Sequence, residues 1–167
     1  GALDSRAMWR YCYCHMAPSS KPHRAPPVPK DHASYAELLG LRAATPLALV
    51  REVARGLPYA TMIRLQRVTG LSSRELADVV NIRMRTVARR KEQGRLEPDE
   101  SDRVLRFARI FAMTVSFFGG DVPAARHWFT TPVRALGGVS PLALAATDAG
   151  TREIEVLIWR VEHGVLT

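Results

Sequence analysis

The chain has 167 residues, of which 24 are Lys or Arg and 16 are Asp or Glu, so its formal net charge is +8. This length fits one ordinary domain or two small ones that share a core. The apolar fraction is 47%, but no apolar run reaches the roughly 20 residues of a membrane span, which argues against a membrane protein. The two cysteines, Cys12 and Cys14, are too close together to staple a fold. The composition therefore predicts a reduced, cytoplasmic protein with a polyanionic partner.

The basic residues are unevenly distributed along the chain. Residues 72–96 carry seven Lys or Arg against three Asp or Glu, whereas residues 97–167 carry seven against nine. This asymmetry indicates two surfaces with different partners, one of them nucleic acid.

The first 30 residues differ from the rest. Five prolines fall within residues 17–30, and prolines in this number favour extended, solvated chain, so residues 1–30 are interpreted as a flexible tail. The opening Gly-Ala is compatible with a cleavage scar, and Met8 and Met16 are both candidate starts.

From residue 31 onward the sequence carries the start and stop signals of helices. Ser, Thr or Asp precedes each apolar-periodic stretch and Gly or Pro follows it, while no stretch has a convincing strand pattern. The sequence therefore predicts an all-α fold, with a helix-turn-helix region over residues 31–97 and a small helical domain over residues 98–167. Outside the charged segment discussed below, the predicted helices lie in residues 32–40, 45–56, 58–70, 72–80, 98–118, 121–129, 140–146 and 151–164.

The longest predicted helix, over residues 98–118, carries one apolar stripe. Its members fall four or three residues apart, which places them on one helix face; they are Val104, Ala108, Phe111, Val115 and Phe118. A long apolar helix, together with the two-fold symmetry that helix-turn-helix operators impose, predicts a homodimer.

Residues 73–92, SRELADVVNIRMRTVARRKE, fit the helix-turn-helix pattern. Ser72 and Glu75 have the spacing of a capping box at the start of the first helix. Ala77 is small enough for two helices to cross there, and Asn81 tolerates the left-handed conformation that such a turn requires. Arg83 stands where many such motifs have a Ser cap. The shared core is predicted to consist of Leu76, Val80, Ile82 and Val87.

The second helix of this motif is predicted to enter the major groove of DNA. If Ile82 and Val87 face inward, Arg85, Thr86 and Arg89 project toward base edges, flanked by Met84 and Ala88. Arginine reads guanine through two parallel hydrogen bonds. The remaining cations are predicted to contact phosphates: Arg83, Arg90, Lys91 and Arg95. The competing interpretation is a solvated charged face with no partner.

Three further segments carry a family resemblance. They are TVARRKEQGRLEPDESDRVLRFARI (86–110), ARHWFTTPVRALGGVSPLALAATDAG (125–150) and VEHG (161–164). On these markers, residues 33–167 resemble the Xre/MbcA/ParS-type antitoxins, the partners of RES-domain toxins. The resemblance implies an N-terminal region that binds the operator of its own operon and a C-terminal domain that captures the toxin.

RES toxins resemble ADP-ribosyltransferases and consume NAD, and the family's antitoxins obstruct the toxin active site with their C-terminal end. The resemblance places this role on Glu162, His163, Gly164, Val165, Leu166 and Thr167. Trp128 and Trp159 are further candidate toxin-binding residues. Trp128 is either an exposed anchor or, more in keeping with an aromatic pair on a short helix, part of the core. Trp159 lies off the stripe formed by Ile154, Leu157, Ile158 and Val161, so it is available to a partner together with Val156.

No enzyme, cofactor or metal site is predicted. The chain has no nucleophile, paired-carboxylate or cofactor motif, and Gly137 and Gly138 lack the strand and Lys of a phosphate loop. The segment CYCH (12–15) lacks zinc-ligand spacing, and His127 and His163 have no nearby ligand set. Two alternatives to an antitoxin of a RES toxin remain: a free-standing dimeric transcription regulator, and an antitoxin whose toxin has another fold.

Overall fold

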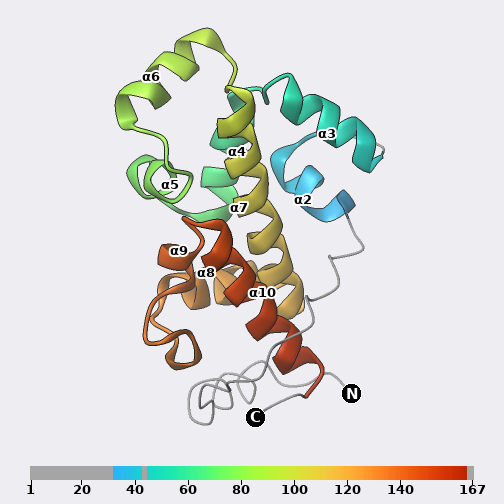
Figure 1. Ribbon diagram of the computed structural model, residues 1–167, viewed down its shortest axis with the longest axis vertical. Helices are drawn as coiled ribbons and strands as arrows, with labels where there is room; N and C mark the ends of the chain where they lie inside the picture. Colours follow the sequence, from blue (N-terminus) through green and yellow to red (C-terminus); the bar gives the residue numbers. More distant parts are fainter. Residues whose placement is uncertain (1–31, 43–44, 165–167) are drawn as a thin grey trace. The chain divides into compact units, whose positions relative to one another are not determined.

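The computed structural model describes residues 32–42 and 45–164 (Figure 1). These residues form α-helices and one 3-10 helix. They contain no strand, only the isolated bridges Pro58–Arg95 and Val133–Val139. The all-α prediction is therefore confirmed. The elements are α2 (His32–Leu39), α3 (Pro46–Ala54), α4 (Ala60–Thr69), α5 (Ser73–Val79), α6 (Met84–Gln93), α7 (Pro98–Phe117), α8 (Val122–Thr130), η1 (Arg134–Leu136), α9 (Pro141–Leu144) and α10 (Asp148–Glu162).

The chain divides into two compact units. The N-terminal unit ends at Met113 and the C-terminal unit begins at Thr114, so the division falls inside α7. The sequence-based boundary between residues 97 and 98 precedes α7 instead. The difference arises because the first turns of α7 hold the helix-turn-helix in place, as described below. Within the described ranges, no helix is long and apolar enough to cross a bilayer.

Most helix starts follow the predicted local chemistry. Ser72 Oγ accepts from the Glu75 amide at 3.2 Å, and the Glu75 carboxylate accepts from the Ser72 amide at 2.8 Å, which completes the capping box. Hydrogen bonding to the Ser72 side chain, and then to the Ser72 amide, holds the pKa of the Glu75 carboxyl below its ordinary value. Side-chain caps also begin α3, α8 and α9, at Thr45, Asp121 and Ser140 respectively.

The last helix begins earlier than predicted. The predicted helix starts at Thr151, whereas α10 begins at Asp148, because Thr147 Oγ1 accepts from the Gly150 amide at 3.0 Å and caps a further turn. α10 ends at Glu162, and Gly164, the predicted stop, follows it with a φ of 64°.

The apolar stripe of α7 belongs to the core. Val104, Ala108, Phe111 and Phe118 are all buried, and only Val115 is half-buried. The stripe therefore offers no surface to a second copy of the chain, and the reasoning that based a homodimer on it is wrong. In the N-terminal unit, α2 also packs on α4.

The C-terminal unit is built from the short helices that follow α7. α9 packs against both α8 and α10, and η1 packs against α10. Of the predicted stripe, Ile154, Leu157 and Ile158 are buried, whereas Val161 is half-buried. At Gly150 the backbones of α10 and α9 approach so closely that a Cβ atom would lie 2.0 Å from the Leu144 carbonyl oxygen. Only glycine fits this position.

Candidate nucleic-acid interface and C-terminal surface

The turn between α5 and α6 has the geometry that the sequence predicts. Asn81 has a φ of 51° and is the single non-glycine residue with positive φ among the described residues. The Ile82 amide donates to the Ala77 carbonyl at 2.8 Å and the Asn81 amide donates to the Asp78 carbonyl at 3.1 Å. These are the two bonds of a Schellman motif, which ends α5 and redirects the chain into α6.

The core between the two helices is also confirmed. Ala77 is completely buried, so a larger side chain at this position would separate α5 from its neighbours. The predicted core residues Leu76, Val80, Ile82 and Val87 are all buried. At the start of α6, Arg83 occupies the N-cap and its side chain makes no capping bond, which agrees with the departure noted in the sequence.

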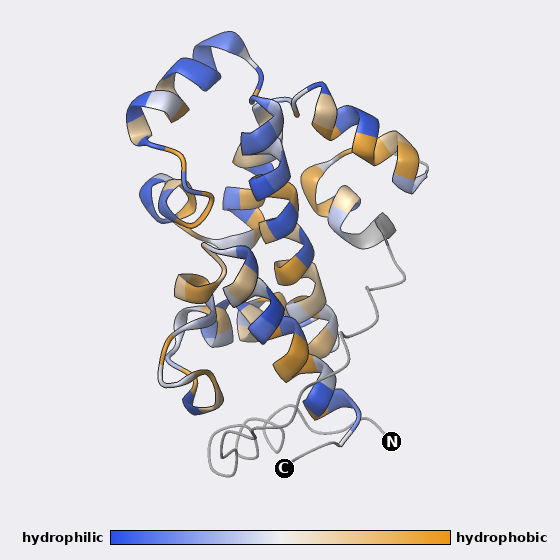
Figure 2. Ribbon diagram, viewed as in Figure 1, coloured by the Kyte–Doolittle hydropathy of each residue, from blue (hydrophilic) through white to orange (hydrophobic). Residues whose placement is uncertain are grey.

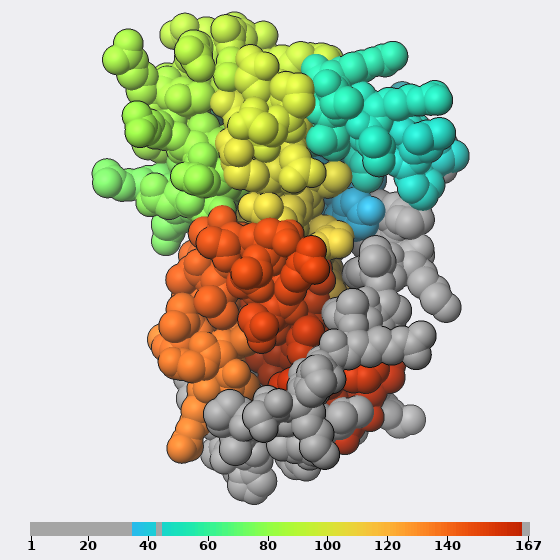
Figure 3. Space-filling view, in the orientation of Figure 1, coloured from blue at the N-terminus to red at the C-terminus, as the bar shows by residue number. Residues whose placement is uncertain are grey.

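One face of α6 presents cations to solvent. Arg85 and Arg89 lie four residues apart and are exposed, as are Arg83 and Lys91, while Met84 is 46% exposed. Figure 2 shows α6 as mostly hydrophilic along its length, and Figure 3 shows the α5–α6 segment in green at the surface of the N-terminal unit. Thr86 is half-buried rather than fully outward. Arg95, a predicted phosphate contact, is exposed and donates to the Arg55 carbonyl at 3.1 Å.

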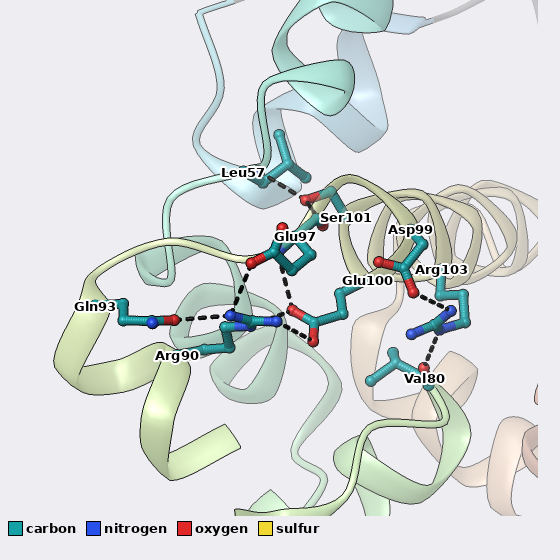
Figure 4. A network of polar contacts seen from close by, with 9 residues as sticks. All are labelled: Leu57, Val80, Arg90, Gln93, Glu97, Asp99, Glu100, Ser101 and Arg103. Carbon is teal, nitrogen blue, oxygen red and sulfur yellow. Dashed lines mark hydrogen bonds and ion pairs between the residues drawn. The ribbon is translucent and has the colours of Figure 1, made fainter. Parts of the chain in front are cut away.

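Arg90 differs from the other cations of α6, and its predicted role as a phosphate contact is wrong. Its side chain is 7% exposed, and so is that of Glu100 on α7 (Figure 4). Arg90 Nε donates to Glu100 Oε2 at 2.7 Å and Nη2 donates to Oε1 at 3.1 Å, in a two-pronged ion pair. Donation to this carboxylate raises the pKa of the Arg90 guanidinium above its ordinary value. The guanidinium is thus buried and bonded to Glu100, so it is not available to contact a phosphate.

The first turns of α7 make two further bonds, one to the helix-turn-helix and one to the segment before α4. Arg103 Nε donates to the Val80 carbonyl at the end of α5 at 2.8 Å, and its Nη1 pairs with Asp99 at 3.0 Å. Ser101 Oγ accepts from the Leu57 amide at 2.7 Å, which attaches the segment before α4. α5, α6 and the segment before α4 are therefore all bonded to side chains in the first turns of α7 (Figure 4).

Sequence reasoning missed this framework. It interpreted the acidic residues at the start of α7 only as charges that favour the positive end of a helix dipole. Glu97 and Glu100 do have capping-box spacing, and the Glu97 amide donates to Glu100 Oε2 at 2.9 Å. That local signal, however, does not indicate which cation the carboxylate receives from another helix.

In the C-terminal unit, the structure corrects one candidate residue. Trp128 is 5% exposed, and its ring lies 6.1 Å from that of Phe118 and 6.2 Å from that of Phe129. Aromatic rings at such separations stabilise a core. Trp128 is therefore a core residue and not an exposed anchor, because its short helix α8 turns this side chain inward.

The end of α10 presents the remaining described candidates. Trp159 is half-buried and stacks on the exposed His163, with ring centroids 4.6 Å apart and planes 23° apart. Nδ1 of His163 lies 2.8 Å from the Trp159 carbonyl oxygen, which only accepts, so Nδ1 is the donor of this hydrogen bond. Glu162 and Gly164 are exposed beside this pair. Val165, Leu166 and Thr167 lie outside the described residues.

Other candidate chemistry is sparse in the part of the chain that the structure describes. It contains no group of three His, Cys, Asp or Glu residues that could hold a metal ion, and the CYCH segment lies outside the described residues. His127 is exposed near the end of α8. The two surfaces that remain are the cationic face of α6 and the end of α10.

Comparison with known proteins assigns the two units separately. Residues 48–109 match the model of the antitoxin Xre-like helix-turn-helix domain, and residues 114–164 match that of the antitoxin Xre/MbcA/ParS C-terminal toxin-binding domain. Antitoxin Xre of Yersinia enterocolitica is 34% identical over 84% of this chain and 95% of its own length. Antitoxin Xre of Photorhabdus laumondii is 32% identical over 67% of this chain and 76% of its own length. Antitoxin Xre of Pseudomonas putida is 33% identical over 50% of this chain and 52% of its own length. With a helix-turn-helix unit followed by a toxin-binding domain, the chain belongs to the Xre antitoxin family.

Proposed function

We propose that this protein is an antitoxin that neutralises a RES-domain, NAD-consuming toxin and represses its own operon by binding operator DNA. The observation that carries the proposal is the match of residues 114–164 to a toxin-binding domain, directly after a helix-turn-helix whose second helix exposes cations. Both activities would take place in the cytoplasm, where operator and NAD are available.

For DNA binding, the proposal assigns α6 to the major groove. Arg85 and Arg89 are the residues proposed to contact base edges, with Met84 and Thr86 beside them. Arg83 and Lys91, exposed at the two ends of the helix, are proposed to contact phosphates. Arg90 is excluded from both groups because its guanidinium is bonded to Glu100.

Replacement of Arg89 by Ala should test this assignment. Loss of one bidentate base contact is expected to weaken operator binding by about 1–3 kcal/mol and to relax base preference at one position. Binding is measured by fluorescence anisotropy on the operator and on single-base variants of it. Arg134→Ala is the matched control, since Arg134 is an exposed arginine of η1 in the other unit. Equal weakening on every DNA sequence would instead make Arg89 a phosphate contact.

For toxin binding, the proposal assigns the end of α10 and the residues that follow it. Glu162, His163 and Gly164 are exposed, and Trp159 supports His163 by stacking. We propose that this end, continued by Val165, Leu166 and Thr167, enters the active-site opening of the toxin and blocks access of NAD. Trp128, which is buried, is not part of this surface.

We also propose that the protein acts as a homodimer, because a helix-turn-helix reads a palindromic operator with two copies of its second helix, about 10 bp or a multiple apart. A pair of apolar side chains on α3 supports the dimer.

Leu47 is 59% exposed and Val50, one turn later, is 62% exposed. Adjacent exposed apolar side chains are expected to be covered by a partner. The double change Leu47→Glu/Val50→Glu should therefore convert a dimer into a monomer in light scattering. A monomeric mass for the unchanged protein at micromolar concentration would contradict the dimer.

The alternative of a free-standing regulator with no toxin is less well supported. It explains α6 but assigns no purpose to a domain that matches a toxin-binding model. The gene beside this one is the simplest observation that separates the possibilities. A RES-domain gene supports the proposal, a toxin gene of another fold changes only the toxin class, and no toxin gene favours the regulator.

A further inference from the structure

Arg90, in the cation-rich helix α6, is buried. Arg90 lies between the exposed Arg89 and Lys91, yet its side chain is only 7% exposed. Its guanidinium makes a bond to Gln93 Oε1 at 2.7 Å and an ion pair with Glu97 Oε1 at 2.9 Å, in addition to the two bonds to Glu100. All three nitrogens of the guanidinium are therefore engaged within the protein.

This ion pair fixes an angle as well as a distance. A planar guanidinium that meets a carboxylate through two parallel bonds restricts both groups to one relative orientation. The Glu100 carboxylate is itself held, because its Oε2 also accepts from the Glu97 amide at the start of α7. The pair consequently connects the body of α6 to the first turn of α7 with little freedom.

The two ends of α6 are held by backbone hydrogen bonds of the flanking turns. Its two buried residues are Val87 and Arg90, which lie one turn apart on the same face. Val87 supplies an apolar contact, which has no preferred direction, so of these two buried residues only Arg90 opposes rotation of the helix body through directional bonds. Such a rotation would move Arg85 and Arg89, which are exposed.

We propose that Arg90 and Glu100 are positioning residues for operator recognition: their buried ion pair sets the orientation in which α6 presents its exposed arginines to base edges. The inference rests on the proposed DNA binding of α6. It predicts that the pair contributes to the preference for operator over other DNA, although neither residue touches DNA.

Two conservative variants separate positioning from a direct contact. Arg90→Lys keeps the charge and loses the two-pronged geometry. Glu100→Gln removes a negative charge, so electrostatics alone would strengthen DNA binding. Positioning predicts the opposite for the operator: in both variants the ratio of operator to non-operator affinity should fall about tenfold or more, with non-operator affinity kept or raised.

The measurement is fluorescence anisotropy on operator and scrambled DNA over a series of salt concentrations. Lys91→Gln is the matched control, since loss of a phosphate contact should weaken binding to both DNAs and reduce the salt slope by about 1. Arg90→Lys should leave the salt slope unchanged. Circular dichroism and hydrogen exchange of the buried α5 amides show whether the N-terminal unit stays folded.

Three results would overturn the inference: an unchanged operator preference in both variants, a reduced salt slope for Arg90→Lys, or an unfolded N-terminal unit in both variants, which would make the pair merely structural. The double variant Arg90→Glu/Glu100→Arg, which exchanges the two charges, should have a higher ratio of operator to non-operator affinity than the single variants. If the unchanged protein itself shows no operator preference, the proposed DNA binding fails and the positioning role fails with it. If it does show one and the variants keep it, only the positioning role fails.

Discussion

Removal of residues 162–167 should abolish protection against the toxin and leave operator binding intact. The deletion takes away the exposed end of α10, including His163, which stacks on Trp159. The buried residues of the helix, Ile154, Leu157 and Ile158, all remain, so the C-terminal unit should still fold. The measurement is survival of cells that express the neighbouring toxin gene together with full-length or truncated protein.

Point variants sharpen this experiment. Glu162→Ala changes one carboxylate at the proposed contact, and Glu153→Ala makes the same change at an exposed position near the other end of α10. Only the first should weaken binding of purified toxin, as measured by calorimetry. Intact protection after the deletion would disprove obstruction of the active site by this end, while leaving the toxin-binding domain to act through another surface.

Replacement of Gly150 by Ala should destabilise the C-terminal unit and with it toxin neutralisation. The added Cβ would lie 2.0 Å from the Leu144 carbonyl oxygen and 2.7 Å from its carbon, and both are backbone atoms that cannot rotate aside. Forced overpacking costs about 1–3 kcal/mol and at times more. A Gly to Ala change in an uncrowded helix would instead stabilise it by about 0.5–1 kcal/mol. The sign of the effect therefore tests the close approach of the two backbones.

Denaturant unfolding measures the change, with Ala149→Ser as the control. Ala149 is the exposed neighbour of Gly150 in α10, so one added atom there meets solvent. Operator binding by the Gly150→Ala variant should persist, because the helix-turn-helix lies in the other compact unit. Equal or greater stability than the unchanged protein would show that α9 and α10 are farther apart than described.

Features that depend on a few neighbouring residues were predictable. The capping box of Ser72 and Glu75 and the left-handed turn at Asn81 involve bonds over three to five residues, so the order of residue types is sufficient to specify them. The same holds for the buried stripe of α10, whose periodicity is set by the helix itself. The family resemblance, which rests on residue order, was likewise confirmed.

The sequence by itself thus determined an all-α chain, most of its helix caps, the helix-turn-helix and the family. The tertiary structure alone decided which charged and aromatic residues are accessible. By sequence Arg90 cannot be distinguished from its basic neighbours. In the structure it forms an ion pair with Glu100 of α7, which follows α6 after the turn at Gly94. Trp128 and the α7 stripe could be contact surfaces by sequence, but other parts of the same chain bury them. Nothing in the sequence distinguishes Gly150 from other helical glycines, and only the close approach of α9 requires a glycine there. Periodicity fixes the direction of a side chain around its own helix, but burial depends on which other segment lies in that direction.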